Sequence, residues 1–297
     1  MIHWLRINSK YLLVTIFGLL VIACSSQEYT TAKLAIQQSD WSKAKEWLPK
    51  AMAVEPDNPE IPIVYAIEVH ARNGDWAKMQ EMLQKALSIT PNKKVEVRAV
   101  FLPVSEQVNN YTQYYWAEQF NAGVEIFKNI QEDPDNKKKY LNQAIENFTN
   151  ASKINPKDAQ TYTTLSKCYL DLDDKEKAIQ LIKTAVEKNP EDFNANFTAG
   201  QIMLRCELSS QEVLPYYQKA VQIEPSNSNA LRELAAMYYD IDQKEKKAVE
   251  TEQERLNKLK ECKGYLKKIK DTKDEIKKKQ KRLDDVRKSR DQPILKF

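Results

Sequence analysis

Glycine is scarce in this sequence, with five occurrences in 297 residues, at positions 18, 74, 123, 200 and 264. Because these glycines are isolated, neither G-x-G-x-x-G nor G-x-x-x-x-G-K-[ST] can be written, which excludes nucleotide binding through such phosphate-cradling loops. The sequence is rich instead in Ala, Lys, Glu, Gln, Asn and Leu, most of which are good helix formers. The composition therefore predicts an all-α fold.

Histidine and cysteine are also rare. His3 and His70 are the only histidines, so a metal site with several histidine ligands cannot be built. The cysteines at 168, 206 and 262 form no C-x-x-C motif. One disulfide is conceivable in an exported protein, but isolated helical cysteines are more commonly buried small hydrophobic residues. Because no catalytic constellation or cofactor motif can be written, we expect no enzymatic activity, no metal and no cofactor.

Charge is nearly balanced over the whole chain but not along it. There are 46 basic and 42 acidic residues, and the formal net charge is +4. The segment from Lys244 to Arg290 alone holds 19 basic and 10 acidic residues, so a basic tail follows an acidic body. Such a mild overall excess does not imply a nucleic-acid partner, and none is expected.

The N-terminus has the order of a secretory signal. Arg6 and Lys10 precede an apolar run of 13 residues, YLLVTIFGLLVIA, and a polar stretch follows at once. Thirteen helical residues cover about 20 Å, which is shorter than the roughly 30 Å hydrocarbon core of a bilayer. We therefore predict a signal peptide over residues 1–23.

The end of this run, Val21-Ile22-Ala23-Cys24, resembles a bacterial lipobox. The resemblance implies that the thiol of Cys24 receives diacylglycerol, that cleavage makes Cys24 the first residue, and that acyl chains such as palmitate anchor the protein. Ser25 resembles the outer-membrane sorting preference of enteric bacteria, which implies an outer-membrane lipoprotein facing the periplasm. An uncleaved anchor helix and an ordinary signal peptide with an incidental cysteine are the alternatives.

An internal repeat runs along the rest of the chain. Phrases such as AVEPDN, KINPKD and QIEPSN place prolines at 56, 91, 156, 190 and 225, with spacings of 35, 65, 34 and 35 residues. The longest interval is one period plus an insertion. Within it, 111–130 and 137–154 are predicted as long helices, and 92–111 as an extra segment bent near Pro103.

One repeat, residues 159–190, resembles the tetratricopeptide repeat (TPR), on the pattern Tyr162-x2-Leu165-Ser166-x2-Tyr169, Ala178-x3-Ile182, Ala185 and Pro190. The resemblance implies that each unit is a pair of closely packed helices. We therefore predict a TPR-like α-solenoid of about six helix pairs over residues 24–258, with an irregular insertion around 92–140. His70 occupies a position that is usually Tyr in the repeat, which favours a packed helix residue over a ligand or base.

Residues 259–297 are predicted to be a charged, helical tail, so that a long basic helix ends the chain. Apolar residues recur in it at the heptad spacing of a coiled-coil contact stripe. In the second half of this stripe, every second position is polar, at Lys273, Gln280 and Arg287. A solvated helix that caps the last repeat is one interpretation. A weak coiled coil or partner-binding helix is another, and binding of anionic lipid or glycan is a third.

The TPR resemblance also implies a peptide groove on the inner face of the first helix of each pair. The matching positions are Gln160, Thr163, Lys167, Asn194, Phe197, Gln201, Arg205, Arg232 and Tyr239. Lys167, Arg205 and Arg232 are a candidate cationic strip for an acidic or extended peptide, with ordinary surface charge as the alternative. The Lys/Asn/Arg clamp that some TPR proteins use for a terminal carboxylate is not matched at Thr163 and Lys167.

These observations predict a lipid-anchored periplasmic TPR scaffold that binds protein or peptide partners. Its layout is similar to that of TPR lipoproteins of outer-membrane protein assembly, of pilus or secretin assembly and of cell-wall remodelling, and the sequence does not choose among them. The alternative is a structural spacer whose basic C-terminal helix binds anionic lipid or cell-envelope glycan. The oligomeric state stays open.

Overall fold

The structure is a computed structural model that describes residues 25–261 and 266–291. The predicted signal peptide, Cys24 and Cys262 lie outside the described residues. The chain divides into two units: unit 1 comprises Met1–Gln119 with Lys153–Asn155, and unit 2 comprises Phe120–Ser152 with Pro156–Phe297. None of the helices in the described ranges is long and apolar enough to cross a membrane.

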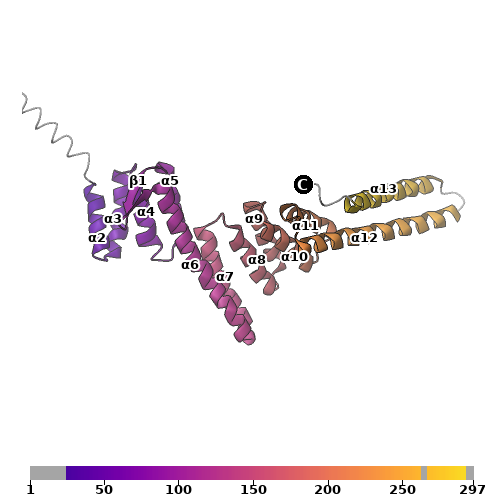
Figure 1. The fold of residues 1–297 in the computed structure, drawn as a ribbon, viewed down its shortest axis with the longest axis horizontal. Helices are drawn as coiled ribbons and strands as arrows, with labels where there is room; N and C mark the ends of the chain where they lie inside the picture. The colour runs from indigo at the N-terminus through magenta and orange to yellow at the C-terminus, as the bar shows by residue number, and fades with distance from the viewer. Residues whose placement is uncertain (1–24, 262–265, 292–297) are drawn as a thin grey trace, which may run out of the picture. The chain divides into compact units, whose positions relative to one another are not determined.

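Unit 1 contains helix pairs and one small sheet (Figure 1). Its elements are α2 (Gln27–Gln37), α3 (Trp41–Val54), α4 (Glu60–Tyr65) with the π-helical turn η2 (Ala66–His70), α5 (Trp76–Ile89), β1 (Lys94–Val97), β2 (Val100–Pro103) and the beginning of α6 (Val104–Glu132).

The elements of unit 2 in its described residues are all helices, joined by short turns. After the end of α6 come η3 (Pro134–Asn136), α7 (Lys137–Ile154), α8 (Ala159–Asp171), α9 (Lys175–Lys188), α10 (Phe193–Arg205), α11 (Ser210–Ile223), α12 (Ser228–Glu261) and α13 (Leu266–Asp291). The predicted all-α, TPR-like fold is confirmed, and α7 has the predicted bounds.

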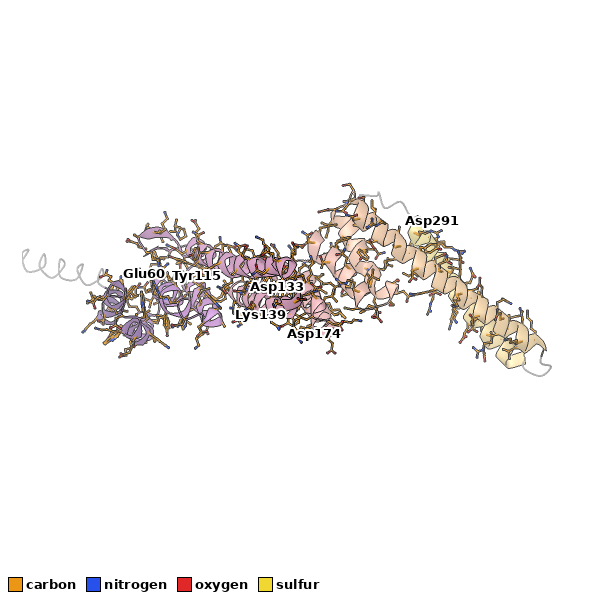
Figure 2. All side chains as sticks on the ribbon, turned by 90° about the horizontal axis from the view of Figure 1, so that it is seen from below. Glu60, Tyr115, Asp133, Lys139, Asp174 and Asp291 are labelled. Atoms are coloured by element: carbon orange, nitrogen blue, oxygen red, sulfur yellow. The ribbon has the colours of Figure 1, made fainter. Side chains whose placement is uncertain are left out.

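The turn inside each helix pair repeats along the chain, which shows that the pairs are copies of one unit. A residue with positive φ stands in the turn of four pairs: Ser39, Gly74, Asp173 and Glu207. In each turn the next backbone N–H donates to the carbonyl five residues before it, as Asp174 does to Tyr169 at 2.9 Å. The Asp174 carboxylate, labelled in Figure 2, also accepts from the N–H of Lys177 at 3.0 Å and caps α9.

Helices within a pair of unit 2 approach closely because a glycine faces an aromatic ring. A Cβ atom on Gly200 would lie 2.5 Å from the ring of Tyr217, and one on Gly123 would lie 2.7 Å from Phe148. Real Cβ atoms do not approach a ring so closely. These two positions therefore require glycine.

The first helix of the second pair contains an extra residue. Pro56 lies 18 residues before the turn residue Gly74, whereas the corresponding separation in the next two regular repeats is 17. The π-helical turn absorbs this residue, and the N–H of Ala71 donates to Ala66 at 2.8 Å. His70 lies in this turn, buried, with its ring centroid 4.3 Å from that of Tyr65. It is a packed residue, as predicted.

Residues 94–103 form a β-hairpin, which the sequence analysis did not predict. The strands are antiparallel with Val97 opposite Val100, and the turn residues Arg98 and Ala99 have φ of 50° and 60°. Val95 and Val97 are buried, while the alternate residues of β1 are exposed. Pro103 ends β2, and α6 therefore begins at Val104 rather than near 111.

The charged tail folds back on the last repeat. Helix α12 continues through the predicted boundary at 258/259, and α13 lies antiparallel to it (Figure 1). Arg287 donates to the buried carboxylate of Asp242 at 3.0 Å, and Lys279 to that of Glu252 at 3.3 Å. Val286 packs against the core of the last repeats. The polar seam residue Arg287 therefore has its partner within the chain.

Candidate functional site

A cleft of about 490 Å³ opens on unit 2, which we call the unit 2 cleft. Its walls come from five helices, α6, α8, α10, α11 and α12. The lining residues are Phe127, Lys167, Leu170, Asp171, Thr198, Gln201, Ile202, Leu204, Arg205, Tyr217 and Glu233. Three of the predicted groove residues, Lys167, Gln201 and Arg205, are thus brought together. Their contact with a ligand stays a prediction.

Two other predicted groove residues serve the packing of the helices. Thr163 is buried, and its hydroxyl donates to the carbonyl of Ala159 at 3.0 Å. Phe197 is half-buried and stacks on Phe193, with ring centroids 5.5 Å apart. Neither side chain lines the unit 2 cleft.

The remaining predicted groove residues are exposed outside the cleft. Gln160 and Asn194 lie in the first turns of α8 and α10. Arg232 lies 3.2 Å from the carboxylate of Glu233, and the side chain of Tyr239 is 64% exposed. Of the three cations of the predicted strip, Lys167 and Arg205 line the cleft, whereas Arg232 pairs with Glu233, and peptide binding by the strip stays a prediction.

Charge in the cleft is mixed. Neither Lys167 nor Arg205 makes a hydrogen bond or ion pair with the described part of the chain. Of the two acids, Asp171 lies 4.0 Å from Lys137, and Glu233 pairs with Arg232. The cations therefore remain open to a ligand, whereas both acids are engaged.

Sequence reasoning missed the acids and aromatic rings of the cleft. Phe127 belongs to the irregular insertion, and Tyr217 is a second-helix residue whose ring reaches the cleft beside Gly200. Both acids lie on the first helix of a pair. Asp171 stands two residues before the turn residue Asp173, and Glu233 directly follows Arg232. The repeat register carried a signal for Asp171, because Arg205 is its equivalent in the next repeat.

Two titratable side chains at or next to the cleft, Cys168 and Tyr217, have raised pKa values. Burial raises the pKa of the Cys168 thiol to about 12, so the reactive thiolate is scarce at neutral pH. Burial also raises the pKa of Tyr217 above its usual value. Cys168 and Cys206 are both free thiols. Within residues 25–261 and 266–291, no three metal-ligating side chains gather as a metal site requires.

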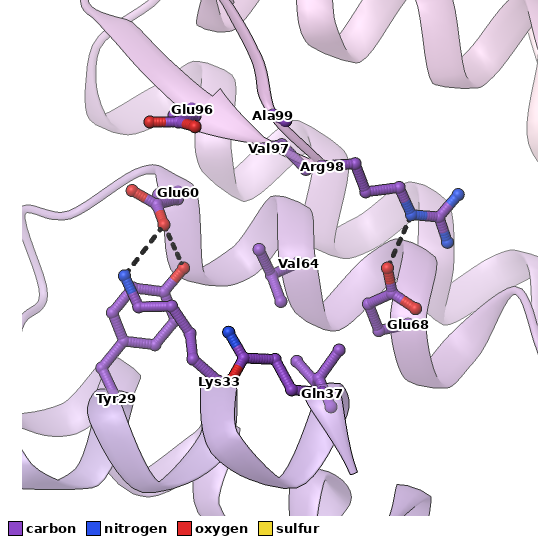
Figure 3. Close-up of a pocket in the computed structure, with 11 residues that line it drawn as sticks. Tyr29, Lys33, Gln37, Glu60, Val64, Glu68, Glu96, Val97, Arg98 and Ala99 are labelled. Atoms are coloured by element: carbon purple, nitrogen blue, oxygen red, sulfur yellow. Dashed lines mark hydrogen bonds and ion pairs between the residues drawn. The ribbon is translucent and has the colours of Figure 1, made fainter. Parts of the chain in front are cut away.

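Unit 1 has a cavity of about 440 Å³ (Figure 3), which we call the unit 1 cavity. It is lined by Tyr29, Lys33, Ile36, Gln37, Glu60, Val64, Glu68, Glu96, Val97, Arg98 and Ala99. The carboxylate of Glu60 accepts from the Tyr29 hydroxyl at 2.6 Å and lies 3.5 Å from the Lys33 ammonium. Glu68 accepts from Arg98 at 2.6 Å and from Arg72 at 3.1 Å.

The two hollows are built on the same face of the repeat. Glu68 in unit 1 and Lys167 in unit 2 each stand six residues before the positive-φ turn residue of their pair. Lys33 and Gln201 hold this position in the neighbouring pairs, and all four residues line one of the two hollows. The difference lies in what covers that face, because Arg98 at the hairpin turn engages Glu68.

Burial of Glu68 and its two guanidinium partners act in opposite directions. Burial by itself would raise the pKa of Glu68, but Arg98 and then Arg72 outweigh it, so the pKa lies below its usual value. The carboxylate is therefore charged at neutral pH and holds the hairpin turn to the second helix pair.

Part of the chain resembles known protein families in sequence. Residues 125–207 match the family model described as Regulator of microtubule dynamics protein 1-3. The BBSome complex member BBS4 of Bos taurus is 29% identical over 98 residues, which cover 33% of this chain and 18% of that protein. The chain thus spans less than a fifth of the length of that relative.

Solved TPR structures are similar to parts of the chain. The Arabidopsis OM64 TPR domain has a TM-score of 0.36 at 19% identity and covers 42% of this chain and 96% of its own. The first TPR of Spaghetti (RPAP3), bound to an HSP90 peptide, has a TM-score of 0.33 at 19% identity, with coverages of 40% and 94%. The TPR protein TTC0263 of Thermus thermophilus has a TM-score of 0.33 at 19% identity, and the match covers 71% of this chain and 98% of that one.

Proposed function

We propose that this protein is a lipid-anchored scaffold that binds a segment of a partner protein in the unit 2 cleft. Solenoids of stacked helix pairs use their concave surfaces for binding. The volume of the cleft lies within the roughly 300–1,000 Å³ typical of ligand sites. The observation that carries the proposal is the pair of unengaged cations, Lys167 and Arg205, beside the apolar walls of that cleft.

The chemistry of the cleft favours a peptide with an acidic side chain next to an apolar one. Lys167 and Arg205 present two positive charges, while Phe127, Leu170 and Leu204 supply apolar surface. A carboxylate between the two cations would form charge-assisted hydrogen bonds, which are stronger than neutral ones. An apolar neighbour would bury surface against the walls.

The proposed attachment to the membrane is a lipid on Cys24. It is supported by the residue pattern at 21–24 and by the polar stretch that follows. Several acyl chains hold a soluble domain far more firmly than one chain does. Anchoring at the periplasmic side of a bacterial membrane, most simply the outer one, would raise the effective concentration of the scaffold for partners in that membrane.

Site-specific crosslinking in intact cells tests partner binding. A photoreactive amino acid in place of Gln201, which lines the same cleft as the two cations, should capture a partner protein. The K167E/R205E double variant should lose this product, because the charge reversal repels an acidic segment. The matched control is K183E/K188E, which reverses two exposed lysines of α9 outside the cleft. Retention of the product in K167E/R205E would contradict the proposal.

Mass spectrometry of the mature N-terminus tests the anchor separately. We expect an acylated Cys24 as the first residue, and loss of acylation with retained precursor in Cys24→Ala. An intact, unmodified Met1 terminus in the membrane fraction would show instead that the apolar run is an anchor helix.

The spacer alternative depends on the outward charges of the tail. Helix α13 is paired with α12, but it exposes Lys277, Lys281 and Lys288. Reversing these three charges keeps the helix pair, whereas a truncation near 243 would cut α12. Under the alternative, the triple variant should lose binding to vesicles that contain phosphatidylglycerol, and the loss should shrink as salt rises. Measured in the Cys24→Ala chain, which lacks the proposed lipid, unchanged binding would exclude anionic lipid as the ligand of the tail.

A further inference from the structure

The described part of the chain begins one residue after the predicted lipid site. The side chain of Ser26 caps α2 by accepting from the N–H of Tyr29 at 3.1 Å. Its own N–H donates to the carboxylate of Glu55 at 2.5 Å, which ties it to the loop after α3. Ser25 alone lies between this fixed residue and position 24. Because two residues of extended chain span at most about 7 Å, a lipid on Cys24 would lie next to the start of α2.

We propose that α2 lies along the membrane surface, with its outer stripe against the lipid headgroups. This inference rests on the lipid anchoring proposed above. The outer stripe is the exposed set of residues at helical spacing that do not line the unit 1 cavity: Gln27, Thr30, Leu34 and the C-cap residue Gln38. Helix α2 is the first described helix of unit 1, and α3 packs on its other side (Figure 1).

The outer stripe suits a headgroup surface because it carries no charge. Its members are amides, a hydroxyl and Leu34, which is 49% exposed. Partial loss of water costs such groups far less than it costs a charged side chain. The next helix differs, since α3 exposes Lys43, Lys45, Glu46 and Lys50. The lysines of α3 would favour anionic headgroups, so it is the short connection from Ser26 to position 24 that sets α2 apart as the face of unit 1 that approaches lipid.

The alternative orientation places unit 1 on its end, with the loop after α3 on the membrane. That end carries Glu28, Glu55, Asp57 and Glu60. Anionic lipids repel such a group of carboxylates. The two orientations differ measurably at Leu34, which lies eight residues beyond Ser26. An upright α2 would lift Leu34 by about 12 Å from the anchor, whereas a flat α2 keeps it at the headgroups.

Photocrosslinking to lipid distinguishes these orientations. The full lipidated chain carries benzoylphenylalanine in place of Leu34, Asp57 or Phe101 and is reconstituted in vesicles of phosphatidylethanolamine and phosphatidylglycerol. Phe101 is the matched control, because it is an apolar residue of the same unit, 62% exposed on the hairpin. We expect several-fold more lipid adduct at position 34 than at positions 57 and 101.

A spacer variant tests whether the short connection causes the contact. A flexible Gly-Ser insertion between Ser25 and Ser26 leaves the sequence around Cys24 intact, and it should lower the adduct at position 34 to the level at 101. An acylated Cys24 with adducts mainly at 57, or equal at all three positions, would overturn this inference alone. An unmodified Cys24 would overturn both the inference and the proposed anchoring.

Discussion

Units 1 and 2 use the same face of the repeat in opposite ways. In the unit 1 cavity the repeat position holds Glu68, which is 6% exposed and engaged by Arg98 of the chain's own hairpin. In the unit 2 cleft the equivalent position holds Lys167, which is exposed and has no ion pair within the described chain. The insertion after the second pair therefore covers one copy of the face and leaves the other open.

This difference indicates how a repeat protein assigns separate tasks to similar units. A charge that an internal partner satisfies contributes to the stability of its unit. A charge that is left solvated contributes little to stability, but it is free to meet a ligand. Substitutions at equivalent positions should therefore have unequal effects, and four experiments follow from that expectation.

The largest effect is expected from undocking the hairpin. The V95A/V97A variant removes methyl groups that are buried against unit 1, and we expect it to lower the free energy of unfolding of that unit by about 3 kcal/mol. The tryptophans at 41, 47, 76 and 116 all lie in unit 1, so urea unfolding followed by tryptophan fluorescence reports on it. The control V100A alters a half-exposed hairpin valine and should be nearly neutral.

A smaller loss is expected in unit 2 from Gly200→Ala. The added methyl group would meet the buried ring of Tyr217, and overpacking of this kind costs about 1–3 kcal/mol. Far-UV circular dichroism should show the loss as an earlier transition in urea. The exposed neighbour provides a control, because Gln201→Ala adds nothing to the core and should leave the transition in place. An unchanged transition in Gly200→Ala would show that the ring can move aside.

The equivalent positions themselves give the most direct comparison. Glu68→Gln removes the charge that Arg98 and Arg72 share, and we expect a loss of about 1.5 kcal/mol in the tryptophan-detected transition. Lys167→Gln should change stability by less than about 0.5 kcal/mol, because the side chain is exposed. Equal losses in the two variants would contradict the assignment of one position to stability and the other to binding.

The smallest expected effect concerns how the stability of unit 1 depends on pH. The Glu68→Gln variant should lose the part of this dependence that comes from the Glu68 carboxylate. The pKa of Glu68 is lowered in the folded chain, so its contribution to stability is complete above the ordinary carboxyl pKa. That contribution disappears as pH falls through the folded-state pKa. The difference in stability between wild type and Glu68→Gln should therefore shrink as pH falls below the ordinary glutamate pKa of about 4.3. Tryptophan-detected urea midpoints measure it, and a constant difference would exclude this role of the carboxylate.

The helix pairs could be predicted from sequence because their causes are local. Proline spacing marks the ends of the repeats, and Asp174 is a helix cap whose partner is three residues away. The bounds of α7 could be predicted because the turn-forming segment QEDPDN comes before it and Pro156 follows it. The hairpin was missed because its turn is Arg98-Ala99, which lacks the Gly, Asn or Asp that usually marks such a turn. The alternation of Val95 and Val97 with polar residues was the available signal.

By itself, the sequence determined the repeat, the helical class and the separation of an acidic body from a basic tail. Each of these depends on residues that are near neighbours along the chain or on composition. Tertiary structure alone decided which charges are engaged. Asp242 meets Arg287 from 45 residues away, and Glu68 meets Arg98 across a π-helical turn and a hairpin. Burial and partner choice depend on which segments fold together, so equivalent repeat positions hold an ion-paired carboxylate, Glu68, in unit 1 and an open cation, Lys167, in unit 2.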